Sequence, residues 1–239
     1  METILITGVF VLAGTVKGVT GMGLPTTAVS LLGLWMAPGA SAALLVMPGL
    51  ATNLAQGRGP GLWRLLRRFW PLWGALFTTT IWMPRLPLAG PIGAHTILGG
   101  VLLAYGLWGL WRPRLPDLSP GSWWLEVVVG VASGVLTALT AVTTIPLVPY
   151  FQSLRLDKDD MVQALGVSFG GAMVALALRL HASGDHAVFT PQAFLALLAA
   201  FAGQWLGNRL RARMSVASFQ RGLLLTFVCM GMLDLLRGG

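Results

Sequence analysis

The sequence is poor in charged residues and has a single cysteine. Aspartate, glutamate, lysine and arginine together make up 10% of its 239 residues, and Cys229 is the one cysteine. One cysteine excludes an intrachain disulfide and a thiolate metal cluster. The sequence also lacks a Walker A motif, and no HExxH motif or acidic cluster suggests a metal, so we expect no cofactor and no bound metal.

Apolar residues dominate the chain. They account for 55% of it, with ten tryptophans, 31 glycines and a mean hydropathy of +0.75, which is typical of a polytopic membrane protein. We predict an all-α transmembrane bundle with about 8 to 10 hydrophobic segments, in which 24–36 and 142–154 are short broken or re-entrant segments. The apolar stretches lie at 4–16, 24–36, 42–55, 69–83, 93–111, 123–141, 142–154, 161–178, 193–206 and 223–236.

The two halves of the chain resemble each other. Gly14 and Gly18 in "GTVKG" match Gly130 and Gly134 in "GVASG", and "GLWGLWR" near the end of the first half resembles "GMLDLLR" near the end of the second. A proline-rich stretch, "RPRLPDLSPG", separates them. We therefore predict a first transmembrane repeat at 1–112, a cytoplasmic linker at 113–122 and a second repeat at 123–239.

The basic residues predict the orientation of these repeats. They gather at 58–68, at Arg112 and Arg114 of the linker, and at 208–221. With five segments in each repeat, all three loops fall on one side, which the positive-inside rule makes cytoplasmic. An odd number of crossings gives the two repeats opposite orientations. Four segments in each repeat would give parallel repeats, and this alternative stays open.

Each repeat contains a break in an apolar segment. The first is "GTVKGVTGMGLPTT" at 14–27, and the second is "SGVLTALTAVTTIP" at 133–146. A broken helix in a membrane frees backbone N–H and C=O groups, so it must face protein or a water-filled cavity. The half-helix that follows points N–H groups and a positive dipole end at that cavity, which suits an anion. Corresponding breaks in two repeats are typical of the substrate sites of secondary transporters.

Polar residues near the breaks are the candidate substrate site. Lys17 is a functional candidate because a lysine inside a membrane is costly, although it can snorkel to the headgroups instead. The third segments carry amides at corresponding places in both halves, and these contact substrate or bond between helices. The candidates are Lys17, Thr20, Gly21, Gly23, Thr26, Asn53, Gln56, Thr140, Thr143, Gln163 and Ser168, with Thr137 and Thr144 as further hydroxyls.

The sequence does not favour an enzyme. "GVASG" is similar to an intramembrane serine-protease motif, but its spacing is wrong and a later segment offers no histidine as base. The remaining polar cluster lies where a segment ends, and we expect it to form a solvated loop. That cluster is Arg179, His181, Asp185 and His186.

Four motifs in order along the chain resemble the TauE/SafE sulfite exporter family. They are "GTVKGVTGMGLP" at 14–25, "LVMPGLATNLAQ" at 45–56, "LDKDDMVQALGVSF" at 156–169 and "WLGNRLRARMSVASFQR" at 205–221. The resemblance implies a multi-pass protein of the bacterial inner membrane that moves sulfite, sulfonates or other small organic anions, coupled to a proton or another ion. This chain departs from the family in having threonines at the second break, where glycines are frequent.

Physics and resemblance lead to one expected function, a secondary transporter that moves small anions by alternating access. The expected partners are a small anionic substrate, the lipid bilayer and a coupling proton or ion, with no nucleic acid; a homodimer is left open. The alternative is a permease subunit or membrane scaffold that works only with a partner protein and uses its basic loops for docking.

Overall fold

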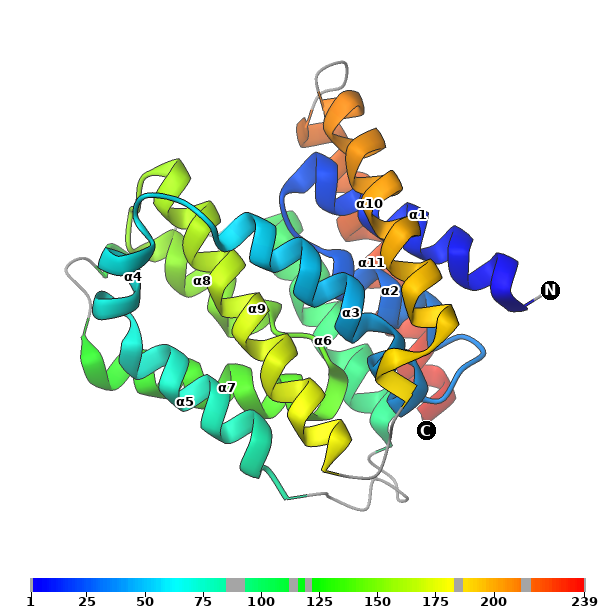
Figure 1. The fold of residues 1–239 in the computed structure, drawn as a ribbon, viewed down its shortest axis with the longest axis horizontal. Coiled ribbons are helices and arrows are strands. Elements are labelled where there is room, and N and C mark those ends of the chain that lie inside the picture. Colours follow the sequence, from blue (N-terminus) through cyan, green and yellow to red (C-terminus); the bar gives the residue numbers. More distant parts are fainter. Residues whose placement is uncertain are drawn as a thin grey trace. The chain divides into compact units, whose positions relative to one another are not determined.

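The computed structural model describes residues 2–84, 93–111, 116–118, 122–182, 187–211 and 216–238. Within these residues all regular structure is helical, which confirms the predicted all-α class (Figure 1). The helices are α1 Glu2–Thr20, α2 Leu24–Leu32, α3 Pro38–Gly57, α4 Leu62–Arg68, α5 Trp70–Trp82, α6 Ala94–Trp111, α7 Trp123–Thr140, α8 Thr144–Ser153, α9 Lys158–His181, the 3-10 helix η1 Ala187–Phe189, α10 Pro191–Arg211 and α11 Val216–Gly238.

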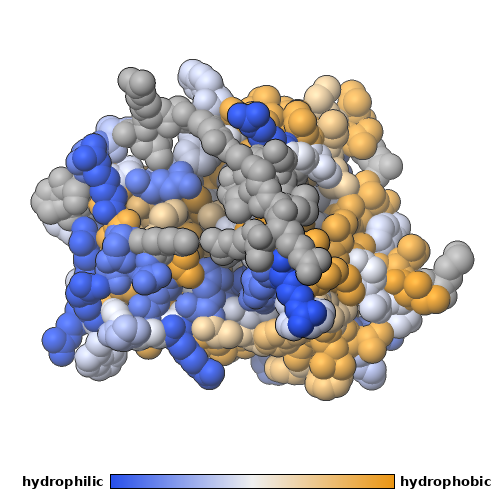
Figure 2. Space-filling view, turned by 90° about the horizontal axis from the view of Figure 1, so that it is seen from above, coloured by the Kyte–Doolittle hydropathy of each residue, from blue (hydrophilic) through white to orange (hydrophobic). Residues whose placement is uncertain are grey.

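Several of these helices suit a bilayer. In the described residues, three helices are long and apolar enough to cross it, at Glu2–Thr20, Trp123–Thr140 and Asp159–His181. Tryptophans at helix ends, among them Trp70, Trp82 and Trp111, are exposed, as an aromatic belt requires. Figure 2 shows hydrophobic residues over a large part of the visible surface. The chain is a helical membrane protein.

The two predicted short segments, 24–36 and 142–154, form the short helices α2 and α8, and each follows a break. Helix α2 has 9 residues and α8 has 10. The predicted basic loops, in contrast, are partly helical: α4 occupies 62–68, and 208–211 and 216–221 belong to α10 and α11. Leucine and arginine are strong helix formers, so a basic stretch rich in both continues as helix. Arg112, Arg114, Asp185 and His186 lie outside the described residues.

The chain divides into two compact units. Unit 1 comprises Met1–Pro48, Arg85–Pro113 and Ala187–Gly239, and unit 2 comprises Gly49–Pro84 and Arg114–His186. In unit 1, α1 packs against α10 and α2, and α6 packs against α11. In unit 2, α5 packs against α7 and α9, and α7 packs against α8. Each unit therefore takes helices from both predicted repeats, and the repeat boundaries themselves stay a prediction.

Matched glycines make equivalent helix contacts in the two units. A Cβ at Gly14 or Gly18 of α1 would lie 2.9 Å from backbone carbon atoms of Ala200 or Gly207 on α10. A Cβ at Gly130 of α7 would lie 2.9 Å from the Cβ of Ala75 on α5, and one at Gly134 would lie 2.8 Å from a backbone oxygen of the same helix. Small residues allow this close packing in membranes. The first helix of each repeat thus packs on the fourth apolar helix of the other, which supports the sequence match.

Candidate functional site

The first break separates α1 from α2 over three residues. Gly21 and Gly23 have φ of 81° and 93°, a left-handed backbone that glycine adopts without steric cost. Thr20, the last residue of α1, donates its hydroxyl to the Val16 carbonyl at 2.9 Å. The same oxygen accepts from the Met22 N–H at 3.2 Å. The glycines shape the turn, and the threonine hydroxyl satisfies part of the backbone that the break exposes.

The second break repeats this arrangement with different residues. Helix α7 ends at Thr140, which donates to the Leu136 carbonyl at 2.8 Å and accepts from the Val142 N–H at 3.2 Å. Ala141 takes the left-handed place of Gly21, with φ of 58°. A non-glycine residue in this region costs about 1 to 3 kcal/mol, so the surrounding structure must hold it there. Thr20 and Thr140 therefore make the same hydrogen bonds at the two breaks.

The two breaks differ in their distance from the matched glycines. Gly18 lies close to the end of α1 at Thr20, whereas Gly134 lies well before the end of α7 at Thr140. The difference is roughly one helical turn of about 3.6 residues. Helix α7 therefore extends about one turn further past its packing contact before it breaks.

Lys17 is buried in the last turn of α1. Only 3% of its surface is exposed, and its carbonyl accepts from the Gly21 N–H at 2.7 Å across the break. A snorkelling lysine lays its stem along the exterior and leaves its ammonium in water. Burial of Lys17 argues against that alternative. Thr26, also a predicted site residue, is fully buried on α2, where its carbonyl accepts from the Ser30 hydroxyl.

Hydroxyl groups cluster at the second break. The Thr137 and Thr143 oxygens lie 2.9 Å apart and share a hydrogen bond, and the Thr137 hydroxyl is also 2.7 Å from the Ser133 carbonyl. Thr137, Thr140 and Thr143 are all buried. Buried hydroxyls that bond to each other and to backbone form a polar lining in an otherwise apolar unit.

The predicted amides join α3 to α9. The Gln56 amide donates to the Val162 carbonyl at 3.1 Å, and the Gln163 amide donates to the Gly57 carbonyl at 3.0 Å. Both amides lie on the third apolar helix of their half, as predicted, but Gln56 lies at the end of α3 and Gln163 near the start of α9, so they do not have the same place within it. They meet because these two helix ends lie together. The interhelical bonding that was one alternative is present, and substrate contact stays a prediction.

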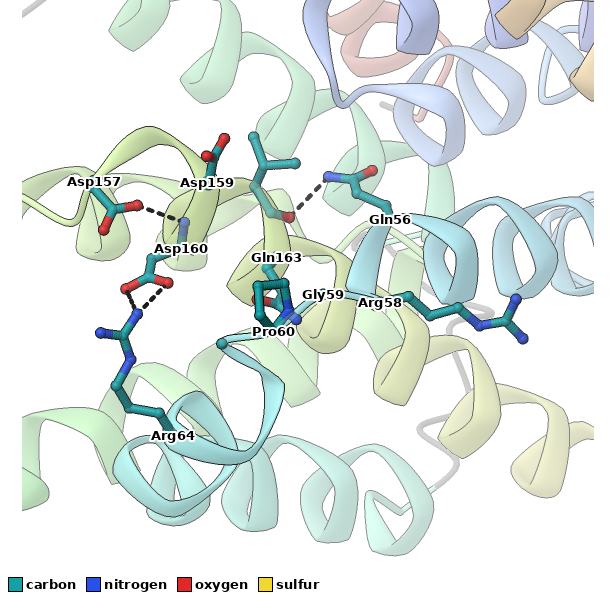
Figure 3. Close-up of a pocket in the computed structure, with 11 residues that line it drawn as sticks. Gln56, Arg58, Gly59, Pro60, Arg64, Asp157, Asp159, Asp160 and Gln163 are labelled. Carbon is teal, nitrogen blue, oxygen red and sulfur yellow. Dashed lines mark hydrogen bonds and ion pairs between the residues drawn. The ribbon is translucent and has the colours of Figure 1, made fainter.

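A cavity of about 770 Å³ opens beside these amides in unit 2 (Figure 3). Arg64 of α4 binds both carboxylate oxygens of Asp160, and Asp157 caps α9 by accepting from the Asp160 N–H at 2.8 Å. Figure 3 shows Arg58 directed away from this group. The cavity is lined by Gln56, Arg58, Gly59, Pro60, Gly61, Arg64, Asp157, Asp159, Asp160, Val162 and Gln163. Its walls therefore carry both signs of charge.

Ser168 and Asn53 are buried where α9 packs. The Ser168 hydroxyl accepts from the Trp73 indole N–H at 2.7 Å and donates to the Ala164 carbonyl at 2.7 Å. Asn53 is 1% exposed and lies opposite Gly170, with 3.8 Å between its Cβ and a Cβ placed at that glycine. Trp73 was not a candidate, because a tryptophan near a helix end is explained by the membrane interface.

The candidate residues fall into two groups. Unit 1 holds Lys17, Thr20, Gly21, Gly23 and Thr26 around the first break. Unit 2 brings together Thr140 and Thr143 at the second break, and it also holds Asn53, Gln56, Gln163 and Ser168. Whether the two breaks line one cavity stays a prediction.

Arg179 was expected in a solvated loop, and this was wrong. It lies on α9, where its guanidinium donates to the Thr80 carbonyl at 3.2 Å and to the Met83 carbonyl. These carbonyls belong to the end of α5, where a cation satisfies backbone acceptors and the helix dipole. Sequence gave no sign of this contact, because α5 and α9 are far apart along the chain.

Glu126 was missed as a candidate. It lies in the first turn of α7 and is 6% exposed, with its carboxylate 3.5 Å from the Tyr150 hydroxyl of α8. The signal was present: an acidic residue within an apolar stretch is by default a functional candidate.

A protein-family model described as Sulfite exporter TauE/SafE matches residues 6–233, nearly the whole chain. No curated protein and no solved structure matches the chain.

Proposed function

Because this chain belongs to the sulfite exporter TauE/SafE family, we propose that it is a secondary transporter for sulfite, sulfonates or related small anions. The family is one of membrane transporters and not of enzymes. The observation that carries the proposal is the family match over residues 6–233, together with a broken helix in each half of that span. We place the chain in the bacterial inner membrane as a multi-pass protein.

The chemistry of the two breaks supports an anion as substrate. Helices α2 and α8 each begin directly after a break, and the first turn of a helix has N–H groups without partners in that helix. These N–H groups and the positive dipole end favour a small anion. Lys17 supplies a positive charge near the first break, and Thr143 a hydroxyl at the second. Each of these groups would replace part of the water that a sulfur oxyanion loses.

The break in each half supports alternating access as the mechanism. The half-helices α2 and α8, with 9 and 10 residues, are shorter than a full span, so each has fewer contacts to break when it moves. Rocking of one group of helices against the other would expose the anion to each side in turn. In this mechanism the glycine contacts of α1 and α7 stay fixed while the breaks open and close.

Flux of labelled sulfite into proteoliposomes of the purified chain tests the proposal. We expect saturable flux under an imposed ion gradient with no ATP and no other protein present. A permease subunit or scaffold that needs a partner would show none. Absence of flux for sulfite and for a set of sulfonates would contradict the proposed function.

A further inference from the structure

One buried acid in unit 2 has no part in the anion site. Glu126 is 6% exposed, and Tyr150, whose hydroxyl faces it, is 4% exposed. Burying an ionisable group is expensive unless the surroundings or the function compensate for it. Glu126 therefore needs an explanation beyond the packing of α7 against α8.

The helix dipole does not provide this explanation. A carboxylate in the first turn of a helix gains about 0.3 to 1 kcal/mol from the positive dipole end. Glu2 also lies in the first turn of its helix, α1, and it is exposed. The dipole accounts for an acid in the first turn of either helix, but it does not require the side chain of Glu126 to point inward.

The surroundings of Glu126 contain few other charges. The Tyr150 hydroxyl of α8 is 3.5 Å from its carboxylate, and Arg68 at the end of α4 acts on it electrostatically. Helix α5, which packs on α7, contains no ionisable side chain. The ionisable residues of α9 lie at its two ends, where Asp160 binds Arg64 and Arg179 caps α5. They are Lys158, Asp159, Asp160, Arg179 and His181.

We propose that Glu126 is the proton-binding group that couples anion transport to a proton gradient, an inference that rests on the proposed function. The step is a single proton transfer: the carboxylate takes up one proton to become a neutral acid and later releases it. As a carboxylate Glu126 accepts from the Tyr150 hydroxyl, and as an acid it donates to the same oxygen. The pair thus keeps a hydrogen bond in both states.

A proton suits this place better than a metal cation. Hard cations such as Ca²⁺ and Mg²⁺ take about six or more oxygen ligands, whereas one carboxylate and one hydroxyl face each other here. The charge of Arg68 opposes the binding of any cation, the proton included, so the choice of a proton rests on the small number of oxygen ligands. Sodium shares the demand for several oxygen ligands, so the proton is the favoured coupling ion.

The position of Glu126 explains how the proton affects the anion. Glu126 and Tyr150 lie on α7 and α8, the two helices that meet at the second break, but Glu126 is in the first turn of α7 and Thr140, at the break, is its last residue. At about 1.5 Å per residue the two are about 21 Å apart along the helix. Protonation removes one negative charge from this helix pair, so it favours an anion at the break through the electrostatic field and not by contact. Release of the proton reverses this preference. Proton and anion occupancy are thereby linked through the same two helices.

The test uses the full chain in proteoliposomes loaded with the pH dye pyranine. Two quantities are measured with labelled sulfite: accumulation driven by a pH gradient, and exchange at equal pH on both sides. For Glu126→Gln we expect at least a ten-fold loss of gradient-driven accumulation and of sulfite-dependent dye response, with exchange retained. Glu126→Asp restores the response, because it restores the carboxylate. Glu2→Gln, the exposed first-turn acid of α1, behaves as wild type.

Each other outcome counts against the inference. Unchanged proton coupling in Glu126→Gln would overturn it. Loss of exchange in Glu126→Gln that Glu126→Asp does not restore would assign Glu126 a structural role and also overturn it. Accumulation in wild type that follows a sodium gradient and ignores pH would overturn the choice of a proton. If the wild-type chain shows no sulfite flux, the proposed function itself is overturned. If the wild type transports sulfite and Glu126→Gln keeps its proton coupling, only the role of Glu126 is overturned.

Discussion

Individual amides and hydroxyls hold helix ends in this protein. The Gly57 carbonyl lies at the end of α3, where a helix has no further N–H group of its own to offer, and Gln163 supplies one from α9. At the two breaks, the hydroxyls of Thr20 and Thr140 each donate to a backbone carbonyl of their own helix and accept from a backbone N–H in the break. These side chains compensate the backbone groups that a membrane cannot solvate.

Gln163→Ala tests whether the Gln163 amide stabilises the end of α3. The substitution leaves the buried end of α3 without its donor, and we expect a loss of about 1 kcal/mol, or roughly 2 to 4 °C in unfolding temperature. Tryptophan fluorescence during heating measures it. Gln152→Ala, which changes an exposed glutamine of α8 in the same unit, is the control. Equal midpoints for both variants would contradict a structural role for the Gln163 amide.

Sequence indicates residue roles where a side chain conflicts with its surroundings. Lys17 was predictable because a lysine in an apolar stretch is rare, and its burial removes the snorkelling alternative. Gln163 was predictable as polar, but its partner Gly57 was not, since contacts distant along the chain leave no local pattern. The same reason hid the Arg179 contacts to α5.

At the scale of elements, pairs of small residues decide which helices lie closest. The glycines of α1 and α7 bring these helices into backbone contact with α10 and α5. Larger side chains at those places need the helices to separate, and a packed core does not yield without cost.

Gly18→Leu and Gly134→Leu are expected to reduce stability by at least about 1 to 3 kcal/mol, the cost of overpacking. A Cβ at Gly18 would meet α10 backbone at 2.8 Å, and one at Gly134 would meet α5 at 2.8 Å. Gly8→Leu provides the control on α1, because no atom lies within 4 Å of a Cβ placed there. Thermal unfolding of the three variants in detergent is the measurement. A Gly8→Leu variant as unstable as the other two would contradict specific packing at the matched glycines.

The two breaks were predictable from the sequence, whereas helix α4 was not. Glycine and proline disfavour helix strongly, so α2 and α8 follow from composition. Helix α4 lies in a stretch that charge marks as a loop, although its leucines and arginines favour helix. The second break was harder to predict from the sequence, because Ala141 adopts a left-handed backbone conformation for which glycine is the usual residue.

At the scale of the whole molecule, we predict two repeats of opposite orientation in the membrane. Charge predicts that the basic stretches at 58–68 and 208–221 and the linker share the cytoplasmic side, with the N-terminus on the other. The helix bounds are compatible with five segments in each repeat, since the short helices α2 and α8 follow the longer helices α1 and α7 at the two breaks.

Cysteine accessibility measures this orientation directly. In a Cys229→Ser background, an impermeant maleimide is expected to label Pro60→Cys, Ser119→Cys and Ser215→Cys from the cytoplasmic side, and Thr3→Cys from the opposite side. The background is clean because Cys229 is the single cysteine. Labelling of Ser215→Cys from the outside would instead indicate four crossings in each repeat and parallel repeats.

We propose that the break in each half contributes to transport of the anion. The most direct measurement is the KM of sulfite flux in proteoliposomes for Lys17→Ala at the first break and Thr143→Val at the second. We predict at least a ten-fold rise in KM for each variant, about 1.4 kcal/mol of lost binding. Thr7→Val, which changes a half-buried threonine whose hydroxyl bonds to its own helix, stays at the wild-type value. A KM that rises for one break and is unchanged for the other would contradict the claim.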